Sequence, residues 1–166
     1  MGTRIARSIR NSMPKIHTKY FQDLDYEEES LFHFPAGIPG FEDERHFLFI
    51  EQPLTKPLMF MQSATREDLC FPALPVQMVE LAYRLNICTE DLELLELAAD
   101  RQPAPGVDVM CFVLVCLTEN APPTVNLLSP VVVNLRSRKA VQAIQIDTDY
   151  SYQQELTGVA QEASCS

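Results

Sequence analysis

The chain has few glycines, and those it has are concentrated at one place. Five glycines occur in 166 residues, and two of them, Gly2 and Gly158, lie near the ends. Two of the other three, Gly37 and Gly40, fall in the stretch "HFPAGIPGFEDERHF" at 33–47. Because glycine adopts positive φ at no steric cost, this stretch predicts a sharp backbone corner between two extended segments.

Long apolar runs are also missing. No segment approaches the roughly 18 consecutive apolar residues of a membrane-spanning helix. The hydrophobic fraction of 46% is that of an ordinary globular protein. A chain of 166 residues is expected to form one domain that buries roughly 70% of its unfolded surface. We therefore expect a soluble protein with no membrane contact.

The cysteine pattern excludes two common classes of site. The five cysteines are an odd number and include no CxxC pair: Cys70, Cys88, Cys111, Cys116 and Cys165. Disulfide scaffolds of secreted proteins and zinc ribbons are typically built from even numbers of closely spaced cysteines. The pattern predicts reduced thiols and a cytoplasmic protein.

Catalytic and metal-binding patterns are equally weak. His17, His33 and His46 all precede the first cysteine, whereas a Cys–His nucleophile needs a histidine beside its thiol. The histidines and nearby acids match no metal-ligand spacing. Cys111 and Cys116 are expected on opposite faces of one strand as small buried hydrophobes. We expect no enzyme, no metal and no cofactor, and keep a cysteine-dependent enzyme as a rival hypothesis.

Acidic residues are absent from the first 19 positions, which hold five bases. Residues 20–166 hold all 23 acids against 8 bases, a balance of −15. A body this negative repels nucleic-acid phosphates and attracts basic proteins, so no direct nucleic-acid binding is expected from it. Residues 1–15 are expected to form a disordered basic extension, although their composition also resembles an organelle transit peptide.

Beyond the basic start, short apolar segments recur about every dozen residues, separated by proline, glycine or acids, as is typical of all-β barrels and sandwiches. The clearest strands are predicted within 107–119 and 130–136, and the β-branched run at 131–133 is expected to be buried on both faces. The segment 139–146 is predicted as another strand. Its inward candidates are Val141, Ile144 and Ile146.

One short surface helix is predicted at "TEDLELLELAAD", residues 89–100, with Thr89 as the N-cap and Leu92 and Leu95 on one face. The expected fold class is mainly β: a compact β-barrel-like single domain with one or two short helices. The domain is predicted over 16–152, followed by a flexible tail at 153–166.

The corner supplies the candidate partner-binding residues. Ile38 and Phe41 either staple the corner or form an exposed apolar tip. Glu42, Asp43 and Glu44 are candidates for electrostatic steering, as is the acidic cluster at 27–29. Asn126 is a further candidate. It precedes "LLSPVVV", where an asparagine closes a turn with its own side chain or contacts a partner.

Five segments in this order resemble the flagellar assembly factor FliW family: "FPAGIPGFE" at 34–42, "PLMFMQSA" at 57–64, "VDVMCFVLVCLTE" at 107–119, "TVNLLSPVVVN" at 124–134 and "VQAIQIDTDY" at 141–150. The resemblance covers about residues 16–150. It implies a small cytoplasmic β-barrel-like bacterial protein that is not an enzyme.

The resemblance also implies two competing partners. Members of the family bind CsrA, a dimeric RNA-binding translational repressor, and flagellin, so that the free protein relieves repression of flagellin synthesis. A monomer is expected. The alternative, from another class, is a small RNA-binding or adaptor protein that acts through the basic residues of 1–19. Residues 1–15 have no counterpart in the family pattern.

Overall fold

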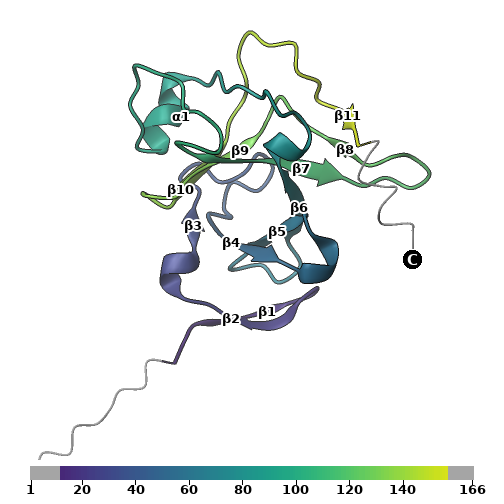
Figure 1. Cartoon of the computed structure of the whole chain (residues 1–166). Helices are drawn as coiled ribbons and strands as arrows, with labels where there is room; N and C mark the ends of the chain where they lie inside the picture. The colour runs from purple at the N-terminus through teal and green to yellow at the C-terminus, as the bar shows by residue number, and fades with distance from the viewer. Residues whose placement is uncertain (1–11, 157–166) are drawn as a thin grey trace, which may run out of the picture.

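The computed structural model describes residues 12–156, and these form a closed β-barrel with one α-helix (Figure 1). The barrel strands are β3 (Phe32–His33), β4 (His46–Glu51), β5 (Met59–Ser63), β6 (Cys70–Pro75), β7 (Met110–Cys116), β9 (Val131–Asn134) and β10 (Lys139–Gln142). Around the barrel the order is β7, β6, β5, β4, β3, β10, β9, and β9 pairs back onto β7. Neighbours are antiparallel except β3 and β10, which are parallel. The predicted fold class is confirmed.

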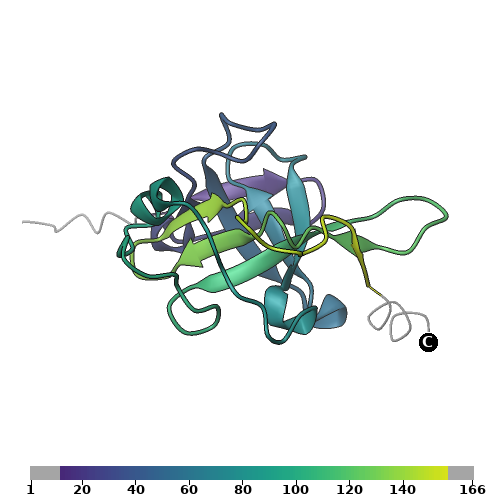
Figure 2. The ribbon, with the colours of Figure 1, turned by 90° about the horizontal axis from the view of Figure 1, so that it is seen from above.

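Smaller elements decorate the barrel. The hairpin of β1 (Lys15–Thr18) and β2 (Gln22–Asp25) lies at the end opposite the helix α1 (Thr89–Leu94), as Figure 1 shows. Two short strands, β8 (Thr124–Val125) and β11 (Gln154–Glu155), extend β7 beyond the barrel. The loop between β7 and β8 projects from the molecule (Figure 2). Three 3-10 turns complete the described elements: Glu28–Ser30, Pro53–Thr55 and Val76–Met78.

Two clusters of buried apolar side chains lie on opposite faces of the barrel strands. The barrel interior is filled from every barrel strand and includes Phe47, Met61, Val131 and Val133. The outer cluster includes Val132 and lies beneath α1 and the segment 76–87. Because alternate side chains point to opposite faces of a strand, β9 needs three consecutive apolar residues. The prediction that 131–133 is buried on both faces is confirmed.

The helix differs from its prediction in length and cap. It ends at Leu94 instead of reaching residue 100, and Cys88, not Thr89, is the N-cap residue. The chain reverses where Glu96 adopts φ +59°, a left-handed conformation that closes a helix C-terminus. Leu92 and Leu95 are fully buried, so the helix is fixed by core packing.

The inward positions after β10 were predicted in the wrong register. The strand ends at Gln142, but alternation continues, so Gln145 is buried while Ile144 and Ile146 are 67% and 40% exposed. The Gln145 amide accepts a hydrogen bond from Asn86 N–H at 2.6 Å and donates to the Tyr83 hydroxyl at 2.9 Å. These hydrogen bonds satisfy the buried amide of Gln145.

The folded part is slightly longer than the predicted domain. Lys15 already belongs to β1, and residues 153–156 include β11 and the buried Leu156 rather than a free tail. The rest of the predicted extension and tail, 1–11 and 157–166, lies outside the described residues.

Candidate partner-binding site

The corner between β3 and β4 is built on a close backbone approach at Gly37. Gly37 and Gly40 have φ of +67° and +85°, as the sequence predicted. A Cβ at Gly37 would lie 2.5 Å from the carbonyl oxygen of Glu42, whereas a Cβ at Gly40 would meet nothing within 4 Å. Ile38, between the two glycines, and Phe41, after the second glycine, form an isolated β-bridge. The corner therefore admits no side chain at its first glycine unless the Glu42 backbone shifts.

Ile38 is not an exposed apolar tip. It is 2% exposed and packs in the barrel interior, because the tight turn directs its side chain inward. Phe41 is half-buried and lies edge-on to Phe71 with ring centroids 5.5 Å apart. The Arg66 guanidinium lies 5.8 Å from the Phe41 ring centroid. Both residues staple the corner, and the alternative of an exposed tip is wrong for Ile38.

The three acids after the corner have different surroundings. Glu42 is exposed and accepts a 2.9 Å hydrogen bond from a backbone N–H of the corner, which lowers the pKa of its carboxyl. Asp43 is exposed. Glu44 is half-buried and accepts hydrogen bonds of 2.6 Å from the hydroxyls of Ser63 and Thr65. Glu42 and Asp43 thus present charge to solvent, whereas Glu44 ties the corner to the β5–β6 turn.

A groove of about 390 Å³ joins the corner to Asn126, and we call it the corner groove. It is lined by apolar and polar residues from both regions: Ile38, Pro39, Phe71, Leu114, Ile144, Asn126, Ser129 and Gln142. Asn126 Oδ1 accepts a hydrogen bond from Leu128 N–H at 2.9 Å and so closes its turn as predicted. The structure therefore brings the corner and Asn126, predicted separately, to one concave surface.

Most of the groove lining was missed by sequence reasoning. Phe71, Leu114 and Gln142 come from β6, β7 and β10, which only barrel closure brings together. Ile144 was predicted to point inward from a strand over 139–146, whereas β10 ends at Gln142 and Ile144 is 67% exposed.

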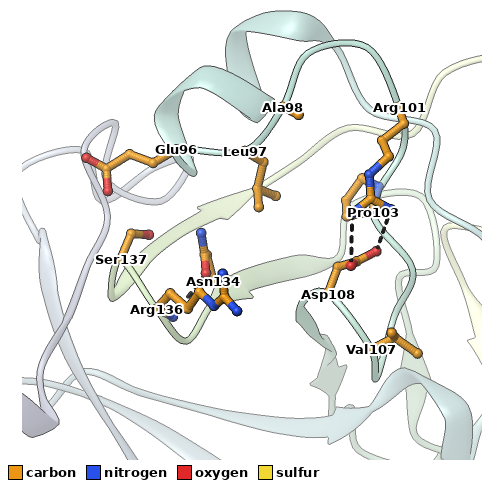
Figure 3. A pocket seen from close by; sticks show the side chains of 10 residues that line it. All are labelled: Glu96, Leu97, Ala98, Arg101, Pro103, Val107, Asp108, Asn134, Arg136 and Ser137. Atoms are coloured by element: carbon orange, nitrogen blue, oxygen red, sulfur yellow. Dashed lines mark hydrogen bonds and ion pairs between the residues drawn. The ribbon is translucent and has the colours of Figure 1, made fainter.

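A larger cavity of about 620 Å³ lies between the chain after α1, the segment 101–108 and the β9–β10 turn (Figure 3). Arg101 pairs with Asp108 across its wall at 3.2 Å. The buried Asn134 donates to the Leu95 carbonyl at 2.8 Å and accepts from Arg136 N–H at 3.0 Å. These bonds hold the end of α1 against the β9–β10 turn, so the Asn134 side chain is used inside the fold.

Of the two cysteines that were predicted to be buried in one strand, only Cys111 is buried. Cys111 is buried, and burial raises its pKa to about 12, while burial raises the pKa of Cys70 to about 11. Both are protonated at neutral pH, unlike a thiolate nucleophile. Cys116 is exposed, contrary to the prediction, because β7 leaves the barrel there to pair with β8. Residues 12–156 contain no group of three His, Cys, Asp or Glu side chains placed to hold a metal.

Two histidines meet across β3 and β4. The rings of His33 and His46 stack with centroids 5.0 Å apart, and Lys139 Nζ lies 2.9 Å from His33 Nδ1. Burial, followed by the positive charge of Lys139, lowers the pKa of His33. His17 differs, because a hydrogen bond from its ring to Asp23 raises its pKa.

Fold and groove together define a small closed β-barrel with one short helix and an apolar groove beside an acidic corner. The family model described as FliW protein matches residues 15–156. The chain belongs to the FliW family. Within residues 12–156, no helix has the length and apolarity needed to cross a membrane.

Individual relatives agree with the family match. The flagellar assembly factor FliW of Syntrophomonas wolfei is 30% identical over 156 residues, which cover 88% of this chain and 96% of that protein. The protein of the same name from Desulfitobacterium hafniense is 32% identical over 143 residues, covering 86% and 90%. A crystal structure of the flagellar assembly factor FliW aligns with a TM-score of 0.73 at 26% identity, over 86% of this chain and 96% of that one.

Replacing Gly37 by alanine should destabilise the protein more than replacing Gly40. Either change places a side chain at positive φ, at a cost of roughly 1–2 kcal/mol, but only Gly37→Ala also forces a Cβ against the Glu42 backbone. Urea unfolding of both variants measures the difference. Equal losses of unfolding free energy in the two variants would show that the close approach does not constrain the corner.

The stability contributions of His33 and His17 should change with pH in opposite directions. The folded pKa of His33 is lowered, so its neutral form contributes stability that is full above the unfolded value near 6.5 and is lost as pH falls. The folded pKa of His17 is raised, so its contribution is full below 6.5 and is lost as pH rises. Unfolding free energies measured at pH 7.5 and pH 5.5 should fall less on acidification in His33→Gln than in the wild type. They should fall more in His17→Gln. The same pH dependence in both variants would contradict these assignments.

Proposed function

We propose that this protein is a non-catalytic flagellar assembly factor that binds a CsrA-type RNA-binding regulator and flagellin. Occupying the regulator relieves repression of flagellin translation, and flagellin competes for the same protein. Membership of the FliW family supports this function. The observation that carries it for this chain is the corner groove, an apolar depression beside the exposed acids Glu42 and Asp43.

The charge distribution suits a basic partner. A regulator that binds RNA presents basic surface, whereas residues 20–166 of this chain carry a balance of −15. Complementary charge raises the association rate and orients the partners before contact. Exposed ion pairs contribute only about 0–1 kcal/mol each, so the affinity has to come from apolar contacts.

The corner groove offers those contacts. Ile144 stands 67% exposed at the groove, and the half-buried Phe71 and Leu114 supply further apolar surface. A volume of about 390 Å³ admits a few partner side chains. The amides of Asn126 and Gln142 lie in the same lining and provide polar groups that orient a bound segment. In this proposal the protein works in the cytoplasm, as a monomer and without a cofactor.

Charge reversal at the corner should slow association with the regulator. Glu42→Lys with Asp43→Lys removes the exposed acids beside the groove, and Glu28→Lys with Glu29→Lys makes the same charge change at another exposed acidic cluster. We expect the association rate to fall about tenfold for the corner variant at low salt and less for the control. Surface plasmon resonance with immobilised regulator measures both. Equal association rates for the two variants would show that the corner does not contribute to the encounter with the regulator.

Loss of Ile144 should weaken the complex itself. Ile144→Ser removes an exposed apolar side chain at the groove, and Leu54→Ser removes a 100% exposed one elsewhere. In an anisotropy assay with labelled RNA bound to the regulator, the wild-type protein should displace the RNA, and added flagellin should restore RNA binding. The Ile144→Ser variant should need an about tenfold higher concentration for the same displacement, which corresponds to about 1.4 kcal/mol of binding free energy. The Leu54→Ser variant should displace the RNA at the wild-type concentration.

The same assay distinguishes the proposed function from the alternative of a protein that binds RNA directly. Without the regulator, the protein should leave the RNA anisotropy unchanged at low salt. A direct shift that disappears on deleting residues 1–11 would instead support an RNA-binding protein acting through its basic arm. Failure to bind both regulator and flagellin would end the proposal.

A further inference from the structure

The basic side chains of the folded part fall into two groups. Four are paired with acids across the surface: Lys15 with Asp25, Lys56 with Glu51, Arg66 with Asp68, and Arg101 with Asp108. The other six form no ion pair within residues 12–156: Lys19, Arg45, Arg84, Arg136, Arg138 and Lys139. Three of these six, Arg45, Arg138 and Lys139, gather with two histidines around the pairing of β3 with β10. We call this group the basic island: His33, Arg45, His46, Arg138 and Lys139.

Strand register assembles the island. His33 of β3 is paired on both edges. Its parallel partner is Lys139 of β10, and its antiparallel partner is His46 of β4. Lys139 Nζ lies 2.9 Å from His33 Nδ1, and because an ammonium group only donates, the histidine nitrogen is the acceptor. The ammonium group of Lys139 therefore keeps further N–H donors for another group.

The arginines are held by uncharged partners. The Arg138 guanidinium lies 3.9 Å from the centroid of the Phe32 ring, and its Nε is buried with no hydrogen-bond partner among the described residues. Arg45 is exposed and donates from Nη1 to the Pro35 carbonyl at 2.9 Å, which leaves its other N–H groups available. The groups that hold the two guanidinium groups, an aromatic ring and a backbone carbonyl, are uncharged. They therefore do not neutralise the positive charges of Arg45 and Arg138.

Gathering cations without counter-ions is unfavourable, and this chain has 23 acids that could have relieved it. The surroundings of His33 show the resulting field. After burial, the causes that lower its pKa are Lys139, His46 and Arg45, and no acid is among them. A bound anion would be attracted to all of these groups at once.

We propose that the basic island binds an acidic segment of a protein partner, with partner carboxylates on Lys139 and Arg45. A short acidic segment fits better than a nucleic acid, because its charges can end at Arg45, whereas a phosphate backbone carries a charge at every nucleotide and would continue to the exposed acids Glu42 and Asp43. This surface is distinct from the corner groove. It therefore does not depend on which protein occupies that groove.

A hexaglutamate peptide tests the proposal on the full chain at low salt. Amide NMR shifts of the wild-type protein should map its binding to β3, the start of β4 and the β9–β10 turn. Arg45→Gln with Lys139→Gln should weaken binding about tenfold, because two charge contacts near the surface are lost. A glutamine at 139 still offers an N–H to His33. The control, Lys19→Gln with Arg84→Gln, removes two exposed bases elsewhere and should change binding less than twofold.

Three outcomes would overturn the proposal. One is the absence of amide shifts in the wild-type protein at millimolar peptide. Another is an equal loss of binding in the control variant, which would show only a general effect of net charge. The third is tighter binding of inorganic phosphate or of a thymidine hexanucleotide at the same amides, which would assign the island to phosphate groups. Melting curves of both double variants establish that they are folded.

Discussion

Barrel closure depends on β9, a four-residue strand that is hydrogen-bonded along both edges. It pairs with β10 through four residue pairs and with β7 through three. Both faces are also covered, since Val131 and Val133 fill the interior while Val132 lies in the outer cluster with residues of α1. Both candidate surfaces follow from this strand. It holds β10 in place, and β10 supplies Gln142 to the corner groove and Lys139 to the basic island.

The sequence predicts elements well where the signal is local. A β-branched run, regular spacing of apolar segments and two glycines in a short stretch identify β9, the other barrel strands and the corner from neighbouring residues alone. Predictions are wrong where distant contacts decide. Gln145 is buried because backbone and side-chain groups of the segment 83–86 receive its amide, and Cys116 is exposed because β8 draws β7 out of the barrel.

The candidate site shows the same division. Polarity and turn chemistry single out Glu42, Asp43 and Asn126 as candidates, and the structure places Asn126 in the same groove as Ile38. Whether an apolar residue beside a turn points out or in is settled by packing, and so Ile38 is buried while Ile144 is exposed. The island was not predicted at all, because its members are spread from residue 33 to residue 139 and no linear pattern links them.

The parallel pairing of β3 with β10 joins side chains 106 positions apart, and this determines when the fold can form during synthesis. The entropy of closing such a loop is lost before any contact within it stabilises the chain. A nascent chain that has not yet emerged to β9 and β10 carries unpaired edges on β3 and β7. Exposed strand edges are templates for aggregation, so a translation product that ends before β9 lacks the closed barrel that covers the edges of β3 and β7.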